Sequence, residues 1–596
     1  MKAYRITSKY LVLLVLFFIS SIVFAGMSSK DTICDYSSLI QKYQSEIKKK
    51  MKSLKVQGIS VVLIDEDSVV WIESFGYADK ENNIKATSTT KYMIGSVTKL
   101  FTAFGIMQLH ELKKLSINDP LQRHLPQFNM KSHFGDINKI TIRSVMTHHG
   151  GIPSDIFTHL VSENPNFTTT VNYINKEYAT YPPDFIRSYS NSGYTLLGHM
   201  IQEVANEPYI EYINKNIFNP LGMLQSGFLV SNDYPEGFSK SYNSKGKPDK
   251  EYPPRDVPAA AIYSNANDMA MFAVSLLSNE HVIVSQKTLK EMLEIQNKSI
   301  KLDLDAKYGL CWSLTDSKAG LIAYHSGASK NHRAMFAIAP YSKLGIVILS
   351  NSENGGSIGS LCRKILEYAA KIKGVELDIE KAYPKYPDYK KINNVKLTED
   401  ELLKDTGYYA APGMCYIIEK RNQKLSAKLQ GVRFNLIPQE NGKYLPQIIF
   451  LGIISKRLKK VRYFFDDVNG HHILVQEQMF SGSKSIIGDR IVPSEITGDW
   501  KKRLGDYSMI TNISSMDEEI FSDISLEIKN DFLNFCLTIN PEKQKMEFPL
   551  KLINENEGQM MGLGRYGGGT LQFTKNKNGE ETLLIYGLQM KKNNLK

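Results

Sequence analysis

The chain has 596 residues, of which 42% are hydrophobic and 23% charged, with a formal net charge of +11. This length exceeds what one hydrophobic core usually contains, so we expect more than one domain. The positive charge is spread along the chain, which does not indicate a nucleic-acid partner. Five scattered cysteines exclude a disulfide framework, and most are expected to be buried thiols: Cys34, Cys311, Cys362, Cys415 and Cys536.

The first 25 residues have the pattern of a secretory signal peptide. Lys2, Arg5 and Lys9 precede the apolar run 10–24, and Ala25 ends a plausible cleavage site. Removal of residues 1–25, which contain no acidic residue, lowers the formal charge from +11 to +8. We therefore expect a periplasmic or secreted protein. The alternative is an uncleaved anchor, although the run is rather short to span a bilayer, and we expect no other membrane attachment.

A serine and a lysine, Ser96 and Lys99, stand three residues apart at the start of the apolar segment 100–109. Residues at i and i+3 share one helix face, so the amine can reach the hydroxyl and activate it as a nucleophile. The same spacing also occurs at Ser45, Ser244 and Ser481. Only the Ser96 copy follows a glycine-ended turn and opens a helix expected to be buried. A plain N-cap serine with a solvated lysine is the alternative interpretation.

Two further motifs follow in chain order. Tyr189-Ser190-Asn191 lies in a loop that leads into an apolar helix expected over 194–204. His325-Ser326-Gly327 ends a strand-like run, 320–324, and two further strands are expected at 334–339 and 344–349. Other Tyr-x-Asn sequences begin at residues 173 and 212, but these fall inside helical patterns.

Together these motifs resemble the serine β-lactamase and penicillin-binding-protein superfamily, specifically its class C-like branch of DD-peptidases, esterases and D-aminopeptidases. The resemblance covers about residues 35–372 and includes the flanking phrases 115–121 and 141–153. It implies an α/β (α+β) fold of the β-lactamase/transpeptidase type, in which helices flank an antiparallel sheet. We expect no cofactor, and no metal, because the adjacent histidine pairs at 148–149 and 471–472 lack further residues at metal-ligand spacing.

The resemblance also implies roles for the motif residues. Ser96 would be the nucleophile, Lys99 and Tyr189 the proton-handling pair, and Asn191 a donor to a substrate amide; which of the pair is the base stays open. The backbone N–H groups of Ser96 and Ala328, the residue after the His325 to Gly327 motif, would form the oxyanion hole. True class C β-lactamases usually carry lysine where this chain has His325. Because histidine is only partly charged near neutrality, we expect weaker binding of a β-lactam carboxylate.

Two other motifs are interpreted structurally. Residues 355–359 match a nucleophile elbow around Ser357, but no acid and histidine follow on further sheet elements as that motif requires. We expect a helix start packed closely on the sheet. Residues 562–567 fit a dinucleotide-binding loop but lead into a strand, so we expect a turn.

The C-terminal third has a different pattern. A linker is expected at 376–398, after the hydrolase domain 26–375, and beyond it come short alternating strands with hairpin signals at Asn441-Gly442, Asn469-Gly470 and Asn578-Gly579. Because segments starting at Gly407 and Gly505 look alike, we expect two β-barrel-like domains, 399–490 and 491–596.

These observations predict a serine hydrolase that forms a Ser96 acyl-enzyme with D-amino-acid peptides, amides or small esters. A true class C-like β-lactamase is one alternative. A non-catalytic protein that binds cell-wall peptides is another. We therefore expect a small-molecule or peptide substrate, whereas the oligomeric state and the role of the C-terminal region stay open.

Overall fold

The computed structural model describes residues 34–162, 165–280, 282–375, 377, 392–429, 432–448, 460–479, 482–511, 520–540, 543–576 and 578–593. The expected signal peptide, 1–25, and the greater part of the expected linker, 376–398, lie outside the described residues. No helix within the described ranges is both long and apolar enough to cross a membrane.

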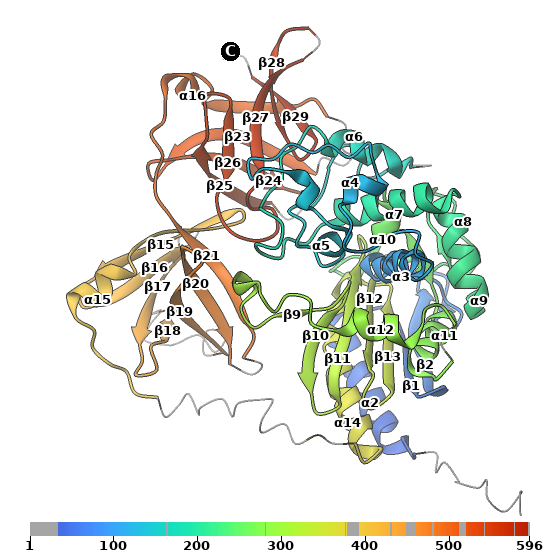
Figure 1. Ribbon diagram of the computed structural model, residues 1–596. Helices are drawn as coiled ribbons and strands as arrows, with labels where there is room; N and C mark the ends of the chain where they lie inside the picture. Colours follow the sequence, from blue (N-terminus) through green and yellow to red (C-terminus); the bar gives the residue numbers. More distant parts are fainter. Residues whose placement is uncertain are drawn as a thin grey trace, which may run out of the picture.

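An eight-stranded antiparallel sheet organises the N-terminal part of the chain, in the order β3-β2-β1-β13-β12-β11-β10-β9 (Figure 1). Its strands are β1 (Gly58–Asp65), β2 (Ser68–Asp79), β3 (Ile84–Lys85), β9 (Lys307–Tyr308), β10 (Ser313–Ser317), β11 (Gly320–Ala328), β12 (Arg333–Ala339) and β13 (Leu344–Ser350). The N-terminal β1 pairs with β13 near the end of this region, in register from Ile59↔Ser350 to Asp65↔Leu344. The sheet is thereby complete without strands from the rest of the chain.

Helices cover both faces of this sheet. Helices α2 (Ser37–Leu54) and α14 (Cys362–Ile372) pack on one face, and α3 (Thr98–Glu111), α7 (Asn191–Ala205) and α11 (Ala266–Leu277) belong to the core on the other. Alternate residues of β1 serve the two cores, because successive strand side chains point to opposite faces: Val61 joins the α2 layer and Val62 the α3 layer. This explains why β1 is an almost continuous apolar run.

Short elements complete the region. They are β4 (Tyr92–Met93), η1 (Gly95–Val97), α4 (Leu121–His124), α5 (Ile142–Met146), α6 (Thr170–Ile174), α8 (Tyr209–Ile213), α9 (Asn219–Leu221), β5 (Gly227–Phe228), β6 (Ser241–Tyr242), β7 (Pro248–Asp249), α10 (Val257–Ala260), β8 (Ile262–Ser264), α12 (Gln286–Leu293) and α13 (Gly356–Gly359). As expected, α13 is a helix start packed closely on the sheet, since a Cβ at the preceding Gly355 would lie 2.3 Å from the Ser350 hydroxyl.

Two expected boundaries are corrected. Strand β11 does not end at Tyr324 but continues to Ala328, because it pairs with β12 as far as Ala328↔Arg333. Helix α7 begins at Asn191 and not at Tyr194, because the Ser190 side chain caps it by accepting a hydrogen bond from Gly193 N. The His325 to Gly327 motif therefore lies within strand β11, whereas Tyr189 and Ser190 lie in the loop before α7 and Asn191 is the first residue of that helix.

The C-terminal third forms two closed eight-stranded antiparallel barrels. The first contains α15 (Glu399–Lys404) followed by β14 (Gly407–Ala411), β15 (Met414–Arg421), β16 (Lys424–Leu429), β17 (Val432–Pro438), β18 (Tyr444–Gln447), β19 (Val461–Val468), β20 (His471–Gln478) and β21 (Lys484–Ile491). The second contains α16 (Gly498–Lys502) followed by β22 (Gly505–Met509), β23 (Phe521–Lys529), β24 (Phe532–Ile539), β25 (Gln544–Leu552), β26 (Glu557–Met560), β27 (Thr570–Lys575), β28 (Glu581–Ile585) and β29 (Leu588–Lys592).

The two barrels share a local feature that explains their similar sequences. Each first strand begins with a glycine whose second following residue is a buried tyrosine, Tyr409 or Tyr507. The Tyr409 hydroxyl donates to the Asp405 carbonyl at 2.9 Å, and the Tyr507 hydroxyl donates to the Arg503 carbonyl at 2.6 Å. In both cases the hydrogen bond ties the strand to the short helix before it.

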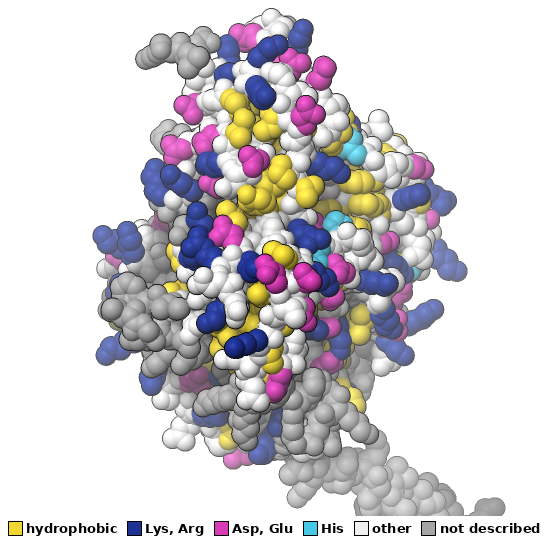
Figure 2. All heavy atoms as spheres, turned by 90° about the vertical axis from the view of Figure 1, so that its left-hand side faces the viewer, with side chains coloured by type: hydrophobic (Ala, Val, Ile, Leu, Met, Phe, Trp, Pro, Cys, Tyr) yellow, Lys and Arg dark blue, Asp and Glu magenta, His cyan; other side chains and the backbone are white. Residues whose placement is uncertain are grey.

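The second barrel packs against the helical side of the N-terminal region, near α5 and α6 (Figure 1). The Glu177 carboxylate accepts a hydrogen bond from Gly587 N at 2.8 Å, and Lys131 Nζ donates to Gln572 Oε1 at 2.8 Å. Figure 2 shows lysine and arginine interspersed with acidic side chains over the face that carries the barrels.

All five cysteines are free thiols, and three of them are buried.

Candidate active site

Ser96 lies in a tight turn between β4 and α3, where the backbone touches strand β11. Gly95 has a positive φ of +50°, and a Cβ there would lie 2.6 Å from the Ala328 backbone. A Cβ on Gly327 would lie 1.9 Å from the Ile94 carbonyl oxygen and 3.3 Å from Ser96 N. Only glycines allow this approach. The Ser96 turn and the end of β11 are therefore held side by side.

Lys99 is fully buried one turn into the helical segment, beside Ser96. Its Nζ lies 3.1 Å from Ser96 Oγ, 2.7 Å from Asn191 Oδ1 and 2.9 Å from the Ala259 carbonyl oxygen. The two amide oxygens can only accept hydrogen bonds, whereas the serine hydroxyl can also donate. The Lys99 ammonium can donate to all three oxygens, and after giving up one proton its amine could still donate to the two amide oxygens and accept the proton of Ser96.

Asn191 joins this pair to a buried carboxylate. Its Nδ2 donates to Asp155 Oδ1 at 2.6 Å, while its Oδ1 accepts from Lys99, so both ends of the amide are held in place. Burial alone would raise the pKa of Asp155, but the Arg565 cation and three hydrogen bonds keep that pKa below its usual value. Asn191 retains one Nδ2 hydrogen for a further acceptor.

Tyr189 is surrounded by cations. Lys99 Nζ lies 5.0 Å from the centroid of its ring, and the guanidinium carbons of Arg187 and Arg565 lie 5.4 and 5.2 Å from it. The His148 ring packs on the same tyrosine with a centroid separation of 4.2 Å. Cations over an aromatic face are attracted by its quadrupole. The motif tyrosine is thereby brought to Ser96 and Lys99 together with two arginines.

His325 is buried, and its charge differs from the sequence expectation. Burial, followed by the Lys99 cation, lowers the pKa of His325 to about 3. Its Nδ1 lies 2.8 Å from the Ser326 carbonyl oxygen, which can only accept, so Nδ1 carries the hydrogen and Nε2 is left as an acceptor. The expectation of a partly charged histidine near neutrality is therefore wrong. In the folded protein this imidazole is neutral and supplies no fixed positive charge.

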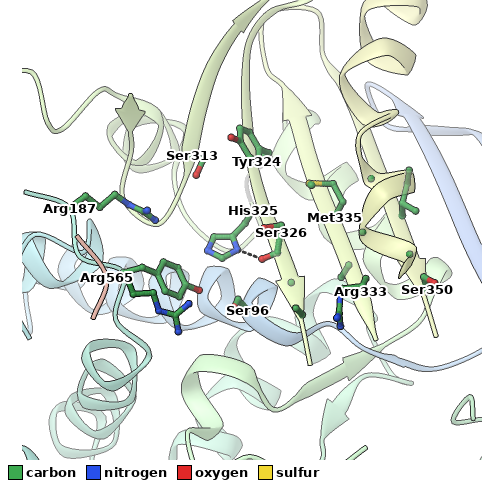
Figure 3. A pocket seen from close by; sticks show the side chains of 18 residues that line it. Ser96, Arg187, Ser313, Tyr324, His325, Ser326, Arg333, Met335, Ser350 and Arg565 are labelled. Atoms are coloured by element: carbon green, nitrogen blue, oxygen red, sulfur yellow. Dashed lines mark hydrogen bonds between the residues drawn. The ribbon is translucent and has the colours of Figure 1, made fainter. Parts of the chain in front are cut away.

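A pocket of about 630 Å³ opens in front of Ser96, Tyr189 and His325 (Figure 3). Three arginines line it, Arg187, Arg333 and Arg565, and no acidic side chain is among its lining residues. Arg187 Nε is buried and has no hydrogen-bond partner among the described residues. The pocket therefore offers an anion the positive charge that His325 does not supply.

Sequence reasoning missed Arg565 and Arg187. Arg565 belongs to the glycine-rich turn 562–567, which is the expected turn but extends from the second barrel into the pocket. The Tyr181 hydroxyl donates to the carbonyls of Gly562 and Gly564 at 2.9 and 3.1 Å and holds this turn against the N-terminal region. Arg187 lies two residues before Tyr189, so its place in the sequence could have indicated that it lies near the pocket. No neighbouring motif indicates that Arg565 reaches the same pocket.

The motifs predicted from the sequence thus converge: Ser96, Lys99, Tyr189, Asn191, His325, Gly327 and Ala328 all lie around one pocket or in direct contact with its lining residues. A mixed sheet-and-helix domain with this arrangement defines the class of β-lactamase and penicillin-binding serine hydrolases. The sequence model of the Beta-lactamase family matches residues 44–370, more than half of the chain, and the chain belongs to this family.

Two curated relatives share this region. Protein flp of Staphylococcus aureus (strain NCTC 8325 / PS 47) is 27% identical over 325 residues, 52% of this chain and 63% of flp. The putative penicillin-binding protein PbpX of Bacillus subtilis (strain 168) is 28% identical over 341 residues, 53% of this chain and 76% of PbpX. The chain therefore spans less than two thirds of the length of flp.

Solved structures share the fold over a greater part of the chain. The octameric penicillin-binding protein homologue from Pyrococcus abyssi has a TM-score of 0.50 and 23% identity, and the match covers 76% of this chain and 98% of that one. SurE, solved with D-Leu, has a TM-score of 0.55 and 17% identity, with 76% and 99% of the two chains covered. Both matches reach beyond the Beta-lactamase region.

Proposed function

We propose that this protein is a secreted or periplasmic serine hydrolase that works through a Ser96 acyl-enzyme on D-amino-acid peptides, amides or small esters. The observation that carries the proposal is the position of Lys99 Nζ, 3.1 Å from Ser96 Oγ and held on its other sides by Asn191 and the Ala259 carbonyl. A base fixed beside a serine hydroxyl is what nucleophilic catalysis requires. Export is supported by the signal-like residues 1–25.

The proposed reaction has two stages. Ser96 Oγ attacks the substrate carbonyl while its proton passes to the Lys99 and Tyr189 pair, and the backbone N–H groups of Ser96 and Ala328 stabilise the oxyanion. Two such donors contribute roughly 3 kcal/mol each to transition-state stabilisation. The pair returns the proton to the leaving group. Water then hydrolyses the acyl-enzyme, activated by the same pair.

The arginines in the pocket favour a substrate that carries a negative charge. A peptide cleaved near its C-terminus has a carboxylate on the leaving part, and Arg187 and Arg565 could pair with it. The same arginines favour a second candidate function, a class C-like β-lactamase, because they could supply the cation that is missing at His325. Nitrocefin hydrolysis separates the peptide or ester hydrolase from the β-lactamase. A kcat/KM for nitrocefin of about 10⁷ M⁻¹s⁻¹ or more would favour the β-lactamase. The third alternative, a non-catalytic binding protein, is disfavoured by the 3.1 Å distance between Lys99 Nζ and Ser96 Oγ, which suits a proton transfer.

The mechanism is tested by covalent labelling. A fluorophosphonate probe should add one adduct to the peptide that contains Ser96, and Ser96→Ala should abolish both this adduct and the hydrolysis of p-nitrophenyl acetate. Ser357→Ala, which removes the serine of the competing elbow motif, is the matched control and should label normally. Labelling that persists in Ser96→Ala, or that maps to Ser357, would contradict the proposal.

A further inference from the structure

A separate cavity, of about 570 Å³, lies between the end of strand β2, the segment 84–90 and the segment 234–241. It shares no lining residue with the Ser96 pocket in the part of the chain that the structure describes. Two of its lining side chains are large and hydrophobic yet exposed, Ile84 at 55% and Tyr234 at 43%. Exposed apolar side chains that gather around a cavity indicate a binding site.

Tyr234 and Phe238 form an aromatic platform in this cavity. Their rings are nearly parallel, with an angle of 8° between the planes and 5.0 Å between the centroids. The Tyr234 hydroxyl donates to the Glu251 carbonyl oxygen at 2.6 Å, and Lys91 N donates to the Gly237 carbonyl oxygen at 2.9 Å. Both the ring and the backbone that carries it are therefore held in place, so a ligand that packs on the exposed Tyr234 ring loses little affinity to ordering of the site.

Threonine hydroxyls line the same cavity. Thr87 Oγ1 lies 3.0 Å from Thr89 Oγ1 and 3.3 Å from Thr90 Oγ1. Thr87 and Thr89 are exposed, so their hydroxyls can also bond to a ligand. Because each hydroxyl both donates and accepts, this row suits a ligand whose own polar groups are hydroxyls.

The charged lining residues of the cavity balance one another. Lys240 Nζ lies 3.7 Å from Asp79 and 3.1 Å from Glu81, and Asp249 lies 3.3 Å from Lys330 Nζ. A cation or an anion would meet groups of its own sign here, whereas an uncharged hydroxyl can accept from an ammonium and donate to a carboxylate. The lining contains three carboxylates and three lysines: Asp79, Asp249, Glu251, Lys85, Lys240 and Lys250.

We propose that this cavity binds a neutral saccharide, with one sugar ring packed on Tyr234 and its hydroxyls bonded to Thr87 and Thr89. A sugar ring has an apolar face of C–H groups and an edge of hydroxyls, which matches an aromatic platform beside hydroxyl groups and balanced charge. An apolar peptide side chain would cover the platform but leave the threonine hydroxyls without partners. The inference goes beyond the proposed function and does not depend on it, because the site is separate from the Ser96 pocket.

The test titrates the full chain by calorimetry with three neutral trisaccharides, maltotriose, cellotriose and chitotriose. At least one should bind with a Kd of about 1 mM or below, and added salt should leave this Kd nearly unchanged, because the ligand carries no charge. Tyr234→Ala should weaken the binding about tenfold, whereas Tyr234→Phe, which keeps the ring, should largely restore it. Thr89→Val keeps the shape of the side chain without its hydroxyl and should weaken the binding several-fold.

Tyr341→Ala is the matched control, because Tyr341 is an exposed tyrosine between β12 and β13, outside the cavity, and it should bind like the parent protein. Absence of binding by all three trisaccharides would overturn the inference, and so would binding that Tyr234→Ala leaves intact. Both substituted side chains are exposed, and the thermal transition of each variant reports whether it folds. Ser96 labelling is measured separately, so failure of the proposed function is distinguished from failure of this inference.

Discussion

At the scale of single residues, the surroundings of His325 and His332 decide whether these two histidines are charged. Both are buried, and burial followed by a nearby cation lowers each pKa to about 3, Lys99 acting on His325 and Arg333 on His332. His332 Nδ1 accepts a hydrogen bond from Met93 N at 2.8 Å, which only an unprotonated nitrogen can do. Neutral imidazoles are therefore part of the folded state on both sides of the Ser96 turn.

Acid should destabilise the protein through these two histidines. Each folded-state pKa lies below the unfolded value near 6.5, so the stabilisation is fully present above pH 6.5 and is lost progressively as the pH falls toward 3. Between pH 6.5 and 5 the loss is on the order of 1–2 kcal/mol for each histidine. Urea unfolding at pH 7.5 and 5 should show this decrease, and His332→Gln should show a smaller one. Equal pH dependence in both proteins would contradict the assignment.

At the scale of elements, the close approach of strand β11 to the Ser96 turn sets the geometry of the site. Gly327 leaves no room for a side chain, since its Cβ would lie 1.9 Å from the Ile94 carbonyl. Gly356, at the start of helix α13 beside the same pocket, has only the flexible Arg333 side chain near its Cβ position, at 3.8 Å. Gly327 and Gly356 therefore form a matched pair for substitution by alanine, because both line the pocket but only Gly356 has room for a Cβ.

Gly327→Ala should push β11 away from the Ser96 turn and misplace the Ala328 N–H. We expect kcat/KM for p-nitrophenyl acetate to fall about 100-fold, with a loss of roughly 1–3 kcal/mol in unfolding free energy. Gly356→Ala should leave activity and the thermal midpoint nearly unchanged. An equal loss of activity in Gly356→Ala would show that the elbow motif, and not the β11 contact, supports catalysis.

At the scale of the whole molecule, the second barrel completes the site. Arg565 and Tyr566 both reach the buried Asp155, at 2.8 and 2.7 Å. We propose that residues 26–375, 399–490 and 491–596 are separate domains, of which the last also acts as a structural part of the active site. The first can close its own sheet, because β1 pairs with β13.

A chain ending near residue 385 should therefore retain a cooperative thermal transition but at a lower midpoint, because Asp155 loses its cation and the apolar side chains of Phe157 and Leu160 lose the barrel core they pack against. Arg565→Ala in the full chain should remove the same cation from Asp155. We expect kcat/KM to fall about tenfold or more. Arg433→Ala removes a surface ion pair of the first barrel, with Glu419, and is the control. A truncated chain that only aggregates would show that the barrels belong to the same folding unit.

The sequence alone determined those features of the protein that depend on residues close together in the chain, namely its motifs and its local secondary structure. The spacing of Ser96 and Lys99, the Tyr189 and His325 motifs and the Asn-Gly hairpins predicted the family, the mixed fold and the C-terminal barrels. Strand ends and the first residue of α7 were misplaced by a few residues, because pairing with β12 and the Ser190 cap decide them.

Only the tertiary structure decided the electrostatics of the site. Arg565 meets Asp155 across a sequence separation of 410 residues, and no local pattern encodes such a contact. The charge of His325 was equally hidden, because it follows from burial and from a cation supplied by another element. Nearest-neighbour patterns specify elements and motifs, whereas desolvation and long-range charge pairs exist only once the chain has folded.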